Sequence, residues 1–315
     1  MASRERTIQI RVRSTASPTA RPLRAALSPS RAADFKQCPL LYRFRVIDRI
    51  EGPPSPAAAR GTLVHAALER LFDLPAAERS PEAAVGLLRP EWERLVREEP
   101  ELATLIAGDA VPADGSEIAD GAGVDEATWF GDAEALVRRW FTLEDPTCLE
   151  PAERELYVEA DVDGLTLRGY VDRLDVAPDG RVRVVDYKTG RAPSELFEGK
   201  ALFQMKFYAL VLWRSRGVMP TLLQLVYLGD GQIVRYAPDE ADLRALERNV
   251  AAVWQAIRRA AETGDWRPRT SRLCDWCDFR DLCPEWGGTP PPLPDDARAL
   301  AVDPSAAGEP EVAQD

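Results

Sequence analysis

The sequence predicts an α/β protein in which a mixed β-sheet is flanked by helices and carries further helical insertions. Two observations indicate this class. Between residues 154 and 187, apolar and polar side chains alternate with a period of two, which is typical of strands. On both sides of that region, apolar residues recur every three or four positions, which is typical of amphipathic helices that cover a sheet.

The N-terminal half is predicted to be mainly helical. Ser28 supplies the oxygen of an N-cap, and Pro29 follows at the first helical position, where the missing N–H costs nothing. The expected elements are a helix from Ser28-Pro29 to about Arg45, a proline-rich linker over 53–56, an amphipathic helix over Gly61–Phe72, and helical pieces over 74–150 with a loop over Asp109–Asp125.

The C-terminal half is predicted to contain the sheet. Asp163-Gly164 has the composition of a two-residue hairpin turn, and Pro178-Asp179-Gly180 that of a three-residue loop with glycine at the left-handed position. The expected strands are Glu155–Val162, Leu165–Val176, Arg181–Tyr187, Leu222–Leu228 and Ile233–Tyr236, the last two paired, and the expected helices are Leu202–Arg216 and Glu240–Thr263.

Length and charge define the expected domain organisation. The 315 residues are enough to bury a proper core, and the net charge is −12. The first fifty residues carry eleven Lys/Arg against three Asp/Glu, which fits either a phosphate-facing segment or a solvated tail. We expect a disordered basic leader over 1–26, one domain over 27–286 and a disordered acidic tail over 287–315. Because neither a run of eighteen apolar residues nor an apolar secretory signal is present, we expect a cytoplasmic protein without a membrane span.

The two hairpin turns fix a strand register that aligns three acids. A turn at Pro178-Asp179-Gly180 places Asp172 opposite Asp186, and a turn at Asp163-Gly164 places Glu155 opposite Asp172. Strand alternation adds Lys188 to the same face. Three adjacent carboxylates repel one another unless a cation neutralises them, and Mg²⁺ or Mn²⁺ prefers such oxygens. A solvated strand face with coincidental acids is the alternative, and a slip of one residue would undo the alignment.

The residues around these acids resemble a known family. Gly169-Tyr170-Val171-Asp172-Arg173-Leu174-Asp175 and Asp186-Tyr187-Lys188-Thr189-Gly190 resemble the GxxDRxD and DYKTG signatures of RecB-type exonucleases, a branch of the PD-(D/E)xK superfamily. The resemblance implies that Asp172, Asp186 and the carbonyl of Tyr187 hold the metal while Lys188 serves catalysis. Glu155 resembles a further acidic position of that family.

Two more motifs of the family have counterparts in the chain. His65, the only histidine, lies in Gly61-Thr62-Leu63-Val64-His65-Ala66-Ala67-Leu68-Glu69, which resembles a GxxxHxxLE helix whose histidine contributes to the metal site. An imidazole ligand favours Mn²⁺ over Mg²⁺. Gln204 and Tyr208, four apart on one helix face, resemble a QxxxY motif that contacts DNA. A lone histidine is otherwise more often an ordinary helix residue.

Four of the five cysteines form a second candidate metal site. Cys274, Cys277 and Cys283 have the spacing C-x2-C-x5-C, and Cys38 would complete a tetrahedral set, while Cys148 stands alone. The spacing fits zinc or an iron–sulfur cluster. The arrangement resembles the iron–sulfur staple of AddB-type and related CRISPR-associated nucleases, which implies a [4Fe–4S] cluster that ties residue 38 to residue 274.

Taken together, the motifs predict a metal-dependent DNA exonuclease that acts on single strands or duplex ends, in DNA repair or recombination. The chain contains no GxxxxGK[ST] phosphate loop, so it either acts alone or works with a separate helicase. Two alternatives stay open. One is a catalytically inactive nucleic-acid-binding or assembly module of a repair complex, and the other is a nuclease of CRISPR adaptation.

Overall fold

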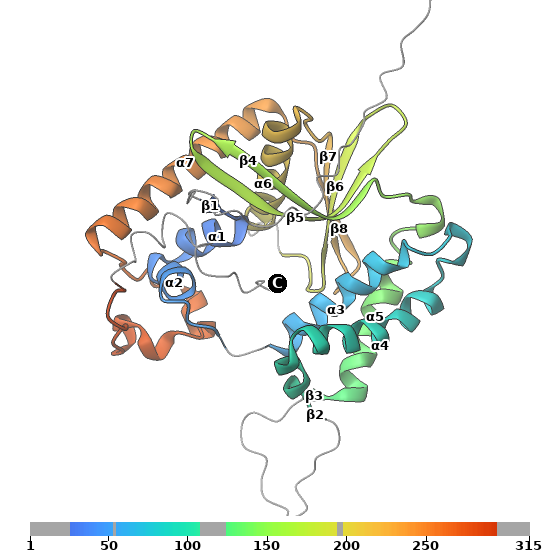
Figure 1. The fold of residues 1–315 in the computed structure, drawn as a ribbon, viewed down its shortest axis with the longest axis horizontal. Coiled ribbons are helices and arrows are strands. Elements are labelled where there is room, and N and C mark those ends of the chain that lie inside the picture. The colour runs from blue at the N-terminus through green and yellow to red at the C-terminus, as the bar shows by residue number, and fades with distance from the viewer. Residues whose placement is uncertain (1–25, 53–54, 108–123, 194–197, 295–315) are drawn as a thin grey trace, which may run out of the picture.

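The computed structural model of the chain describes residues 26–52, 55–107, 124–193 and 198–294 (Figure 1). Its strands are β1 (Ala26–Leu27), β2 (Ile106–Ala107), β3 (Val124–Asp125), β4 (Glu153–Val162), β5 (Leu165–Val176), β6 (Val182–Lys188), β7 (Leu222–Tyr227) and β8 (Gln232–Tyr236). Its α-helices are α1 (Pro29–Gln37), α2 (Pro39–Tyr42), α3 (Pro56–Leu71), α4 (Pro81–Glu98), α5 (Glu126–Trp140), α6 (Glu198–Arg216) and α7 (Glu240–Thr263).

A mixed sheet of six strands forms the centre of the fold. Its order is β1-β5-β6-β7-β8, and β4 pairs with β5 outside that path. The β4–β5, β5–β6 and β7–β8 pairs are antiparallel, whereas β1–β5 and β6–β7 are parallel. One edge of β5 pairs with β4 along most of its length, so its other edge must hold β1 at the start and β6 at the end. The mixed α/β class predicted from the sequence is confirmed.

Helices cover both faces of the sheet because each central strand is apolar on both sides. In β6, Val182 and Val184 pack into one core with α1, α2, α6 and α7, while Val185 and Tyr187 pack into a second core with α3, α4 and α5. Figure 1 shows α3, α4 and α5 grouped on one side of the sheet and α6 and α7 on the other. The strand period of two thus divides the molecule into two cores.

Three helices begin with the same serine-proline pair. The hydroxyl oxygens of Ser28, Ser55 and Ser80 each accept a hydrogen bond from the backbone N–H three residues later, and a proline follows each serine at the first helical position. Each hydroxyl satisfies one N–H that the first turn of the helix leaves without a partner. The repeated pair explains where α1, α3 and α4 start.

Most predicted elements occur where the sequence placed them. The strand over 165–176 and the helix over 240–263 have the predicted bounds, and the β7–β8 pair forms as expected. Both turns are also confirmed, because Asp163 and Gly164 have positive φ, as does Gly180. The region 74–150 is helical in pieces, with short 3₁₀ turns at Ala76–Glu78, Pro100–Leu105 and Pro146–Cys148 beside α4 and α5.

Three expectations about the N-terminal half need correction. The first helix does not continue to Arg45, because Cys38 adopts an extended conformation that ends α1 before Pro39 starts α2. A π-helical segment, Arg43–Ile47, follows α2. The helix of His65 begins at Pro56 and not at Gly61, so part of the expected linker is helical. Residues 1–25 of the expected leader over 1–26, residues 109–123 of the expected loop over 109–125, and residues 295–315 of the expected tail over 287–315 lie outside the described residues.

The three shortest strands were not predicted. β1 pairs with β5, and β2 pairs with β3, over two residues each. Two residues are too few to show an alternating pattern, so their pairing comes from the surrounding packing. None of the helices in the described part of the chain is long and apolar enough to cross a membrane.

Candidate functional site

The strand registers worked out from the turns are those that the structure has. Leu156 lies opposite Val171 and Arg154 opposite Arg173, so Glu155 and Asp172 occupy matching positions. Glu155 itself leaves the regular ladder with a φ of 43°, a conformation that side chains rarely adopt. The strain falls on the acid that the sequence placed next to Asp172, at the position where β4 reaches the site.

β5 and β6 separate at the two aspartates, and we call this separation the fork. The regular β5–β6 pairing ends with Arg173 opposite Val185, one residue short of Asp172 and Asp186. Beyond it, the backbone N–H of Tyr187 donates to Oδ2 of Asp172 at 2.8 Å. A side-chain carboxylate therefore takes the place of a backbone acceptor and holds the two strands at the point where they diverge.

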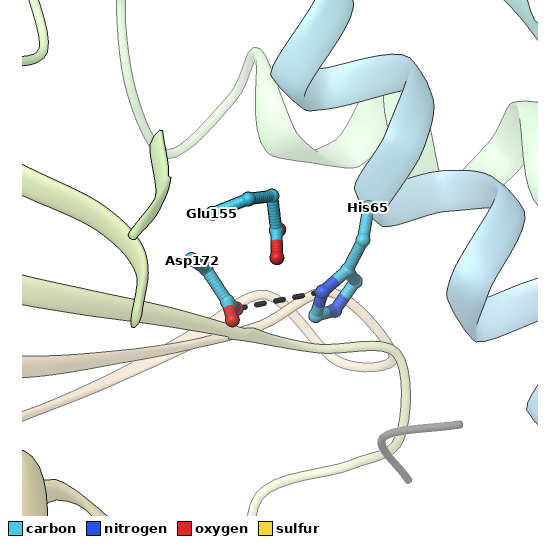
Figure 2. Close-up of side chains that lie close together, drawn as sticks. All are labelled: His65, Glu155 and Asp172. Carbon is cyan, nitrogen blue, oxygen red and sulfur yellow. Dashed lines mark ion pairs between the residues drawn. The ribbon is translucent and has the colours of Figure 1, made fainter. Parts of the chain in front are cut away.

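Three possible ligands from three elements meet at the fork. One ligand atom each from His65 in α3, Glu155 in β4 and Asp172 in β5 lies within 4.8 Å of the others. Nδ1 of His65 is 3.5 Å from Oδ2 of Asp172. Figure 2 shows the imidazole of His65 reaching from its helix toward the two carboxylates. The geometry brings together residues that are 107 positions apart in the sequence, from 65 to 172.

The second aspartate is buried and carries an uncompensated oxygen. Asp186 is 1% exposed, and burial raises the pKa of its carboxyl to about 6, against the lowering effect of Lys188. Among the described residues, Oδ1 of Asp172 and Oδ1 of Asp186 have no hydrogen-bond partner. Buried carboxylate oxygens without a partner cost free energy unless a cation or water meets them. The donor set of carboxylates and one imidazole suits Mg²⁺ or Mn²⁺.

Lys188 is held between the carboxylates and an amide from α6. Its Nζ lies 3.0 Å from Oδ2 of Asp186 and donates to Oε1 of Gln204 at 3.0 Å. Burial alone would lower the pKa of Lys188, but the charges of Asp186 and Asp172 outweigh it and raise that pKa. The side chain is therefore a fixed ammonium group beside the fork.

Gln204 and Tyr208 form a chain of hydrogen bonds behind Lys188. Nε2 of Gln204 donates to the hydroxyl oxygen of Tyr208 at 3.0 Å. Tyr208 is 3% exposed, so its ring is packed within the protein, and its expected contact with DNA stays a prediction. A Cβ at Gly169 would lie 2.6 Å from the Tyr208 ring, so only glycine lets that ring pack here. The glycine of the GxxD motif thus supports the lysine through two side chains.

A buried ion pair lies on the other side of Tyr187. Arg173, 1% exposed, makes two hydrogen bonds to Glu144, at 2.9 Å and 2.7 Å, and its guanidinium also contacts the Tyr187 hydroxyl. Glu144 further accepts hydrogen bonds from Trp140 and Gln224. Burial alone would raise the pKa of Glu144, but Arg173 lowers it. The pair fixes the tyrosine whose backbone N–H binds Asp172.

Glu144 is the residue of this region that the sequence did not reveal. It stands alone between a helix and a strand, with no spacing that would single it out among the many acids of the chain. Its partner Arg173 is part of the DRxD motif. An arginine predicted to lie inside a sheet requires a buried acid nearby, and this requirement was the available signal.

Four cysteines line one cavity: Cys38, Cys274, Cys277 and Cys283. Backbone N–H groups of Arg269 and Ser271 donate to the sulfurs of Cys38 and Cys274, both at 3.3 Å. Burial, and more weakly the other three cysteines, raise the pKa of the Cys283 thiol. No three cysteine sulfurs of the described residues lie within 4.8 Å of one another. Cys148 is exposed and lies apart, against Asp145.

Around the cavity, segments near the two ends of the described chain contact each other directly. The ring of Tyr42 stacks on Trp266 with centroids 5.9 Å apart, and Phe44 packs on Phe279 at 5.5 Å. The Arg269 guanidinium donates to the carbonyl oxygen of Lys36 at 2.6 Å. Protein side chains therefore bring the segment of residue 38 and the segment of residue 274 into the predicted contact, without a bound metal group.

In this fold, a mixed sheet brings two aspartates, a glutamate and a lysine together at the point where β5 and β6 separate. This combination of fold and site is the basis for assigning the class of the protein. Residues 26–284 match the PD-(D/E)XK nuclease superfamily. The chain belongs to that superfamily.

Two phage proteins are similar to the chain in sequence. The gene 69 protein of Mycobacterium phage D29 is 32% identical over 136 residues, which are 41% of this chain and 47% of the phage protein. The gene 69 protein of Mycobacterium phage L5 is 23% identical over 299 residues, which are 86% of this chain and 99% of that protein. The match to the D29 protein thus spans just under half of that relative's length.

One solved structure has a partly similar backbone fold. It is that of an inferred exonuclease from Eubacterium rectale, which covers 80% of this chain and 87% of its own, with 13% sequence identity and a TM-score of 0.46.

Proposed function

We propose that the protein is a metal-dependent DNA exonuclease of the RecB type that hydrolyses phosphodiester bonds. The observation that carries the proposal is the pair of buried oxygens, Oδ1 of Asp172 and Oδ1 of Asp186, beside the ammonium group of Lys188. Each aspartate keeps one buried oxygen without a partner, although Tyr187 N–H and Lys188 meet the other, and a catalytically inactive module would not need such oxygens. A bound cation would offset the cost in free energy of these unpartnered oxygens.

The residues present fit a divalent cation. Asp172, Asp186, the backbone carbonyl of Tyr187 and His65 would hold it, with Glu155 as a further acid. When bound, the cation supplies positive charge next to the phosphate and lowers the pKa of a coordinated water. The imidazole of His65 favours Mn²⁺ over Mg²⁺ at this site.

The side chains around the cation would then act through their positions. Lys188, fixed by Asp186 and Gln204, holds an ammonium group where charge develops on the phosphate. Tyr208 and Gly169 keep Gln204 in place. Arg173 and Glu144 hold Tyr187 in place, and the backbone N–H of Tyr187 in turn holds the carboxylate of Asp172.

End-labelled single-stranded DNA and Mn²⁺ provide the test. We expect the wild-type protein to release short products from an end, and Lys188→Ala to lose cleavage by a factor of about a hundred or more. Lys206→Ala is the matched control, because Lys206 lies on α6 but contacts Tyr236 and Asp242. Absence of cleavage with Mn²⁺ and with Mg²⁺, on single strands and on duplex ends, would refute the proposal and favour a binding or assembly module. A time course on the same substrates separates exonuclease from endonuclease products.

We also propose that the four cysteines bind a [4Fe–4S] cluster. All four cysteines line one cavity, and the choice of a cluster over zinc rests on the resemblance of their arrangement in the sequence. The N–H groups on two of the sulfurs are of the kind that stabilise cluster thiolates.

Spectroscopy and metal analysis test the cluster. We expect a brown protein with broad absorbance near about 400 nm that disappears in Cys274→Ser and persists in Cys148→Ser. Stoichiometric zinc in a colourless wild-type protein would overturn the cluster. Because metal binding is coupled to folding, Cys274→Ser should also unfold at a lower temperature.

The cellular role that we propose is DNA repair or recombination in the cytoplasm, with a separate helicase as the partner. The sequence motifs of the RecB type favour this role, and the helicase is proposed because the 315 residues contain no GxxxxGK[ST] phosphate loop; action without a motor is the alternative. Participation in CRISPR adaptation is the competing role. Purification of the tagged protein under native conditions, with the associated proteins identified, distinguishes a helicase from an adaptation complex.

A further inference from the structure

Two exposed tyrosines stand side by side on the hairpin of β4 and β5. Tyr157 and Tyr170 are directly opposite in the strand register, and their ring centroids are 5.3 Å apart with a 58° angle between the rings. They are 42% and 43% exposed, which makes them two of the few large apolar side chains on the described surface. A paired aromatic surface of this size is a common place for a ligand to bind.

The pair lies next to the acidic site. Tyr170 is two residues from Asp172 on β5, and Tyr157 is two residues from Glu155 on β4. Residues two apart on a strand are about 7 Å apart along it. The tyrosines therefore occupy the next step along the hairpin from the candidate metal ligands Glu155 and Asp172.

The neighbouring residues fix one of the rings and add a positive charge beside the pair. The hydroxyl of Tyr157 donates to Oε2 of Glu159 at 2.6 Å, which fixes the ring. Arg168 lies opposite Glu159 in the register, one step beyond the tyrosines. Along the hairpin, the acids Glu155 and Asp172 are thus followed by two aromatic rings and then by a guanidinium group beside a carboxylate.

We propose that Tyr157 and Tyr170 form a stacking platform for an unpaired base of the DNA strand, adjacent to the phosphate that is cleaved. The proposal rests on the nuclease function given above and names its substrate class as a single strand. Aromatic rings stack on any base, because each base has an apolar face, whereas bases inside a duplex already stack on their neighbours. Arg168 would meet the phosphate on the far side of that base.

Binding without turnover tests the platform separately from catalysis. The probe is a fluorescently labelled oligodeoxythymidylate, titrated in Ca²⁺ with anisotropy as the readout. We expect the double variant Tyr157→Ala/Tyr170→Ala to bind about fivefold to a hundredfold more weakly than the wild type, as loss of one stacked base predicts. Tyr170→Phe, which keeps the ring, should bind as the wild type does. Met219→Ala is the matched control, because Met219 is 38% exposed on the loop before β7.

A second measurement keeps the proposal testable even if the double variant is unstable. Wild-type protein is titrated with oligonucleotides that lack one base at successive positions from the end. Stacking predicts that removal of one particular base weakens binding and that the tyrosine substitutions no longer matter on that oligonucleotide. Equal binding of all these oligonucleotides, or binding of the double variant within twofold of the wild type, overturns the platform.

The two proposals fail in different ways. If the wild type binds single strands through the tyrosines and cleaves nothing in Mn²⁺, the nuclease function is wrong and the platform stands as a binding site. If the wild type cleaves and the double variant binds and cleaves equally well, the platform is wrong and the nuclease function stands.

Discussion

Asp186→Asn is the substitution that best separates stability from function at the fork. In the folded protein, burial holds the pKa of Asp186 at about 6, above its ordinary value of 3.8. A carboxyl whose pKa is higher in the folded state binds more protons there than in the unfolded chain. The metal-free protein therefore loses stability as the pH rises from about 4 to about 6, and this loss is complete at pH 8.

The size of this loss follows from the two pKa values. The difference between 3.8 and about 6, at about 1.36 kcal/mol per pKa unit, corresponds to about 3 kcal/mol. An asparagine resembles the protonated carboxyl in shape and carries no charge to desolvate. We therefore expect Asp186→Asn to raise the free energy of unfolding at pH 8 by up to about 3 kcal/mol, and to change it little at pH 4.

Urea denaturation with EDTA, at both pH values, measures the effect. Asp175→Asn is the control, because Asp175 is paired with Arg173 and Arg183 and its loss should destabilise the protein. Added Mn²⁺ should stabilise the wild type at pH 8 and not the Asp186→Asn protein, since the variant lacks a ligand. A variant less stable than metal-free wild type at pH 8 would show that the buried charge costs nothing and that the reasoning is wrong.

Three further substitutions probe the supports of the site. Glu144→Gln should cost about 3–5 kcal/mol in urea denaturation because it leaves the buried Arg173 without its partner, and combining it with Arg173→Met should cost less than the sum of the two changes; additive losses would contradict the pairing. Gly169→Ala should cost about 1–3 kcal/mol and lower kcat severalfold at unchanged KM, since the new methyl displaces the tyrosine ring above it; normal turnover would exclude this support of the lysine. Cys277→Ser should lose iron and lower the melting temperature together, and iron retained at the wild-type level would remove that cysteine from the ligands.

The sequence predicted the parts of the fold that follow from local rules. Turn residues with positive φ, such as Gly164 and Gly180, set the hairpin registers, and the registers carried Asp172 to its place beside Asp186. Simple alternation, however, assumes a regular strand. It could not reveal the positive φ of Glu155, because a regular strand has negative φ throughout.

Contacts over long sequence separations were harder to predict. His65 reaches Asp172 from α3, which is far from β5 in the sequence, and only a motif suggested the contact. The burial of Tyr208 depends on how α6 packs over β5, which its four-residue spacing from Gln204 does not encode. The break at Cys38 shows the reverse case, since the following Pro39 disfavours helix at the preceding residue and was a readable signal.

The fork has a practical consequence for capturing the protein with its substrate. Asp172 is at once a candidate ligand and the acceptor of the Tyr187 N–H, so the choice of inactive variant decides whether the strands stay as they are. Asp172→Asn retains a carbonyl oxygen for that N–H and lowers the charge. Asp172→Ala leaves a buried donor unsatisfied, at a cost of about 1–3 kcal/mol, and removes the link that holds β6 to β5 at the fork. Crystals of a trapped complex should therefore be grown with the asparagine, because the alanine would report a different pocket from the one that the substrate meets.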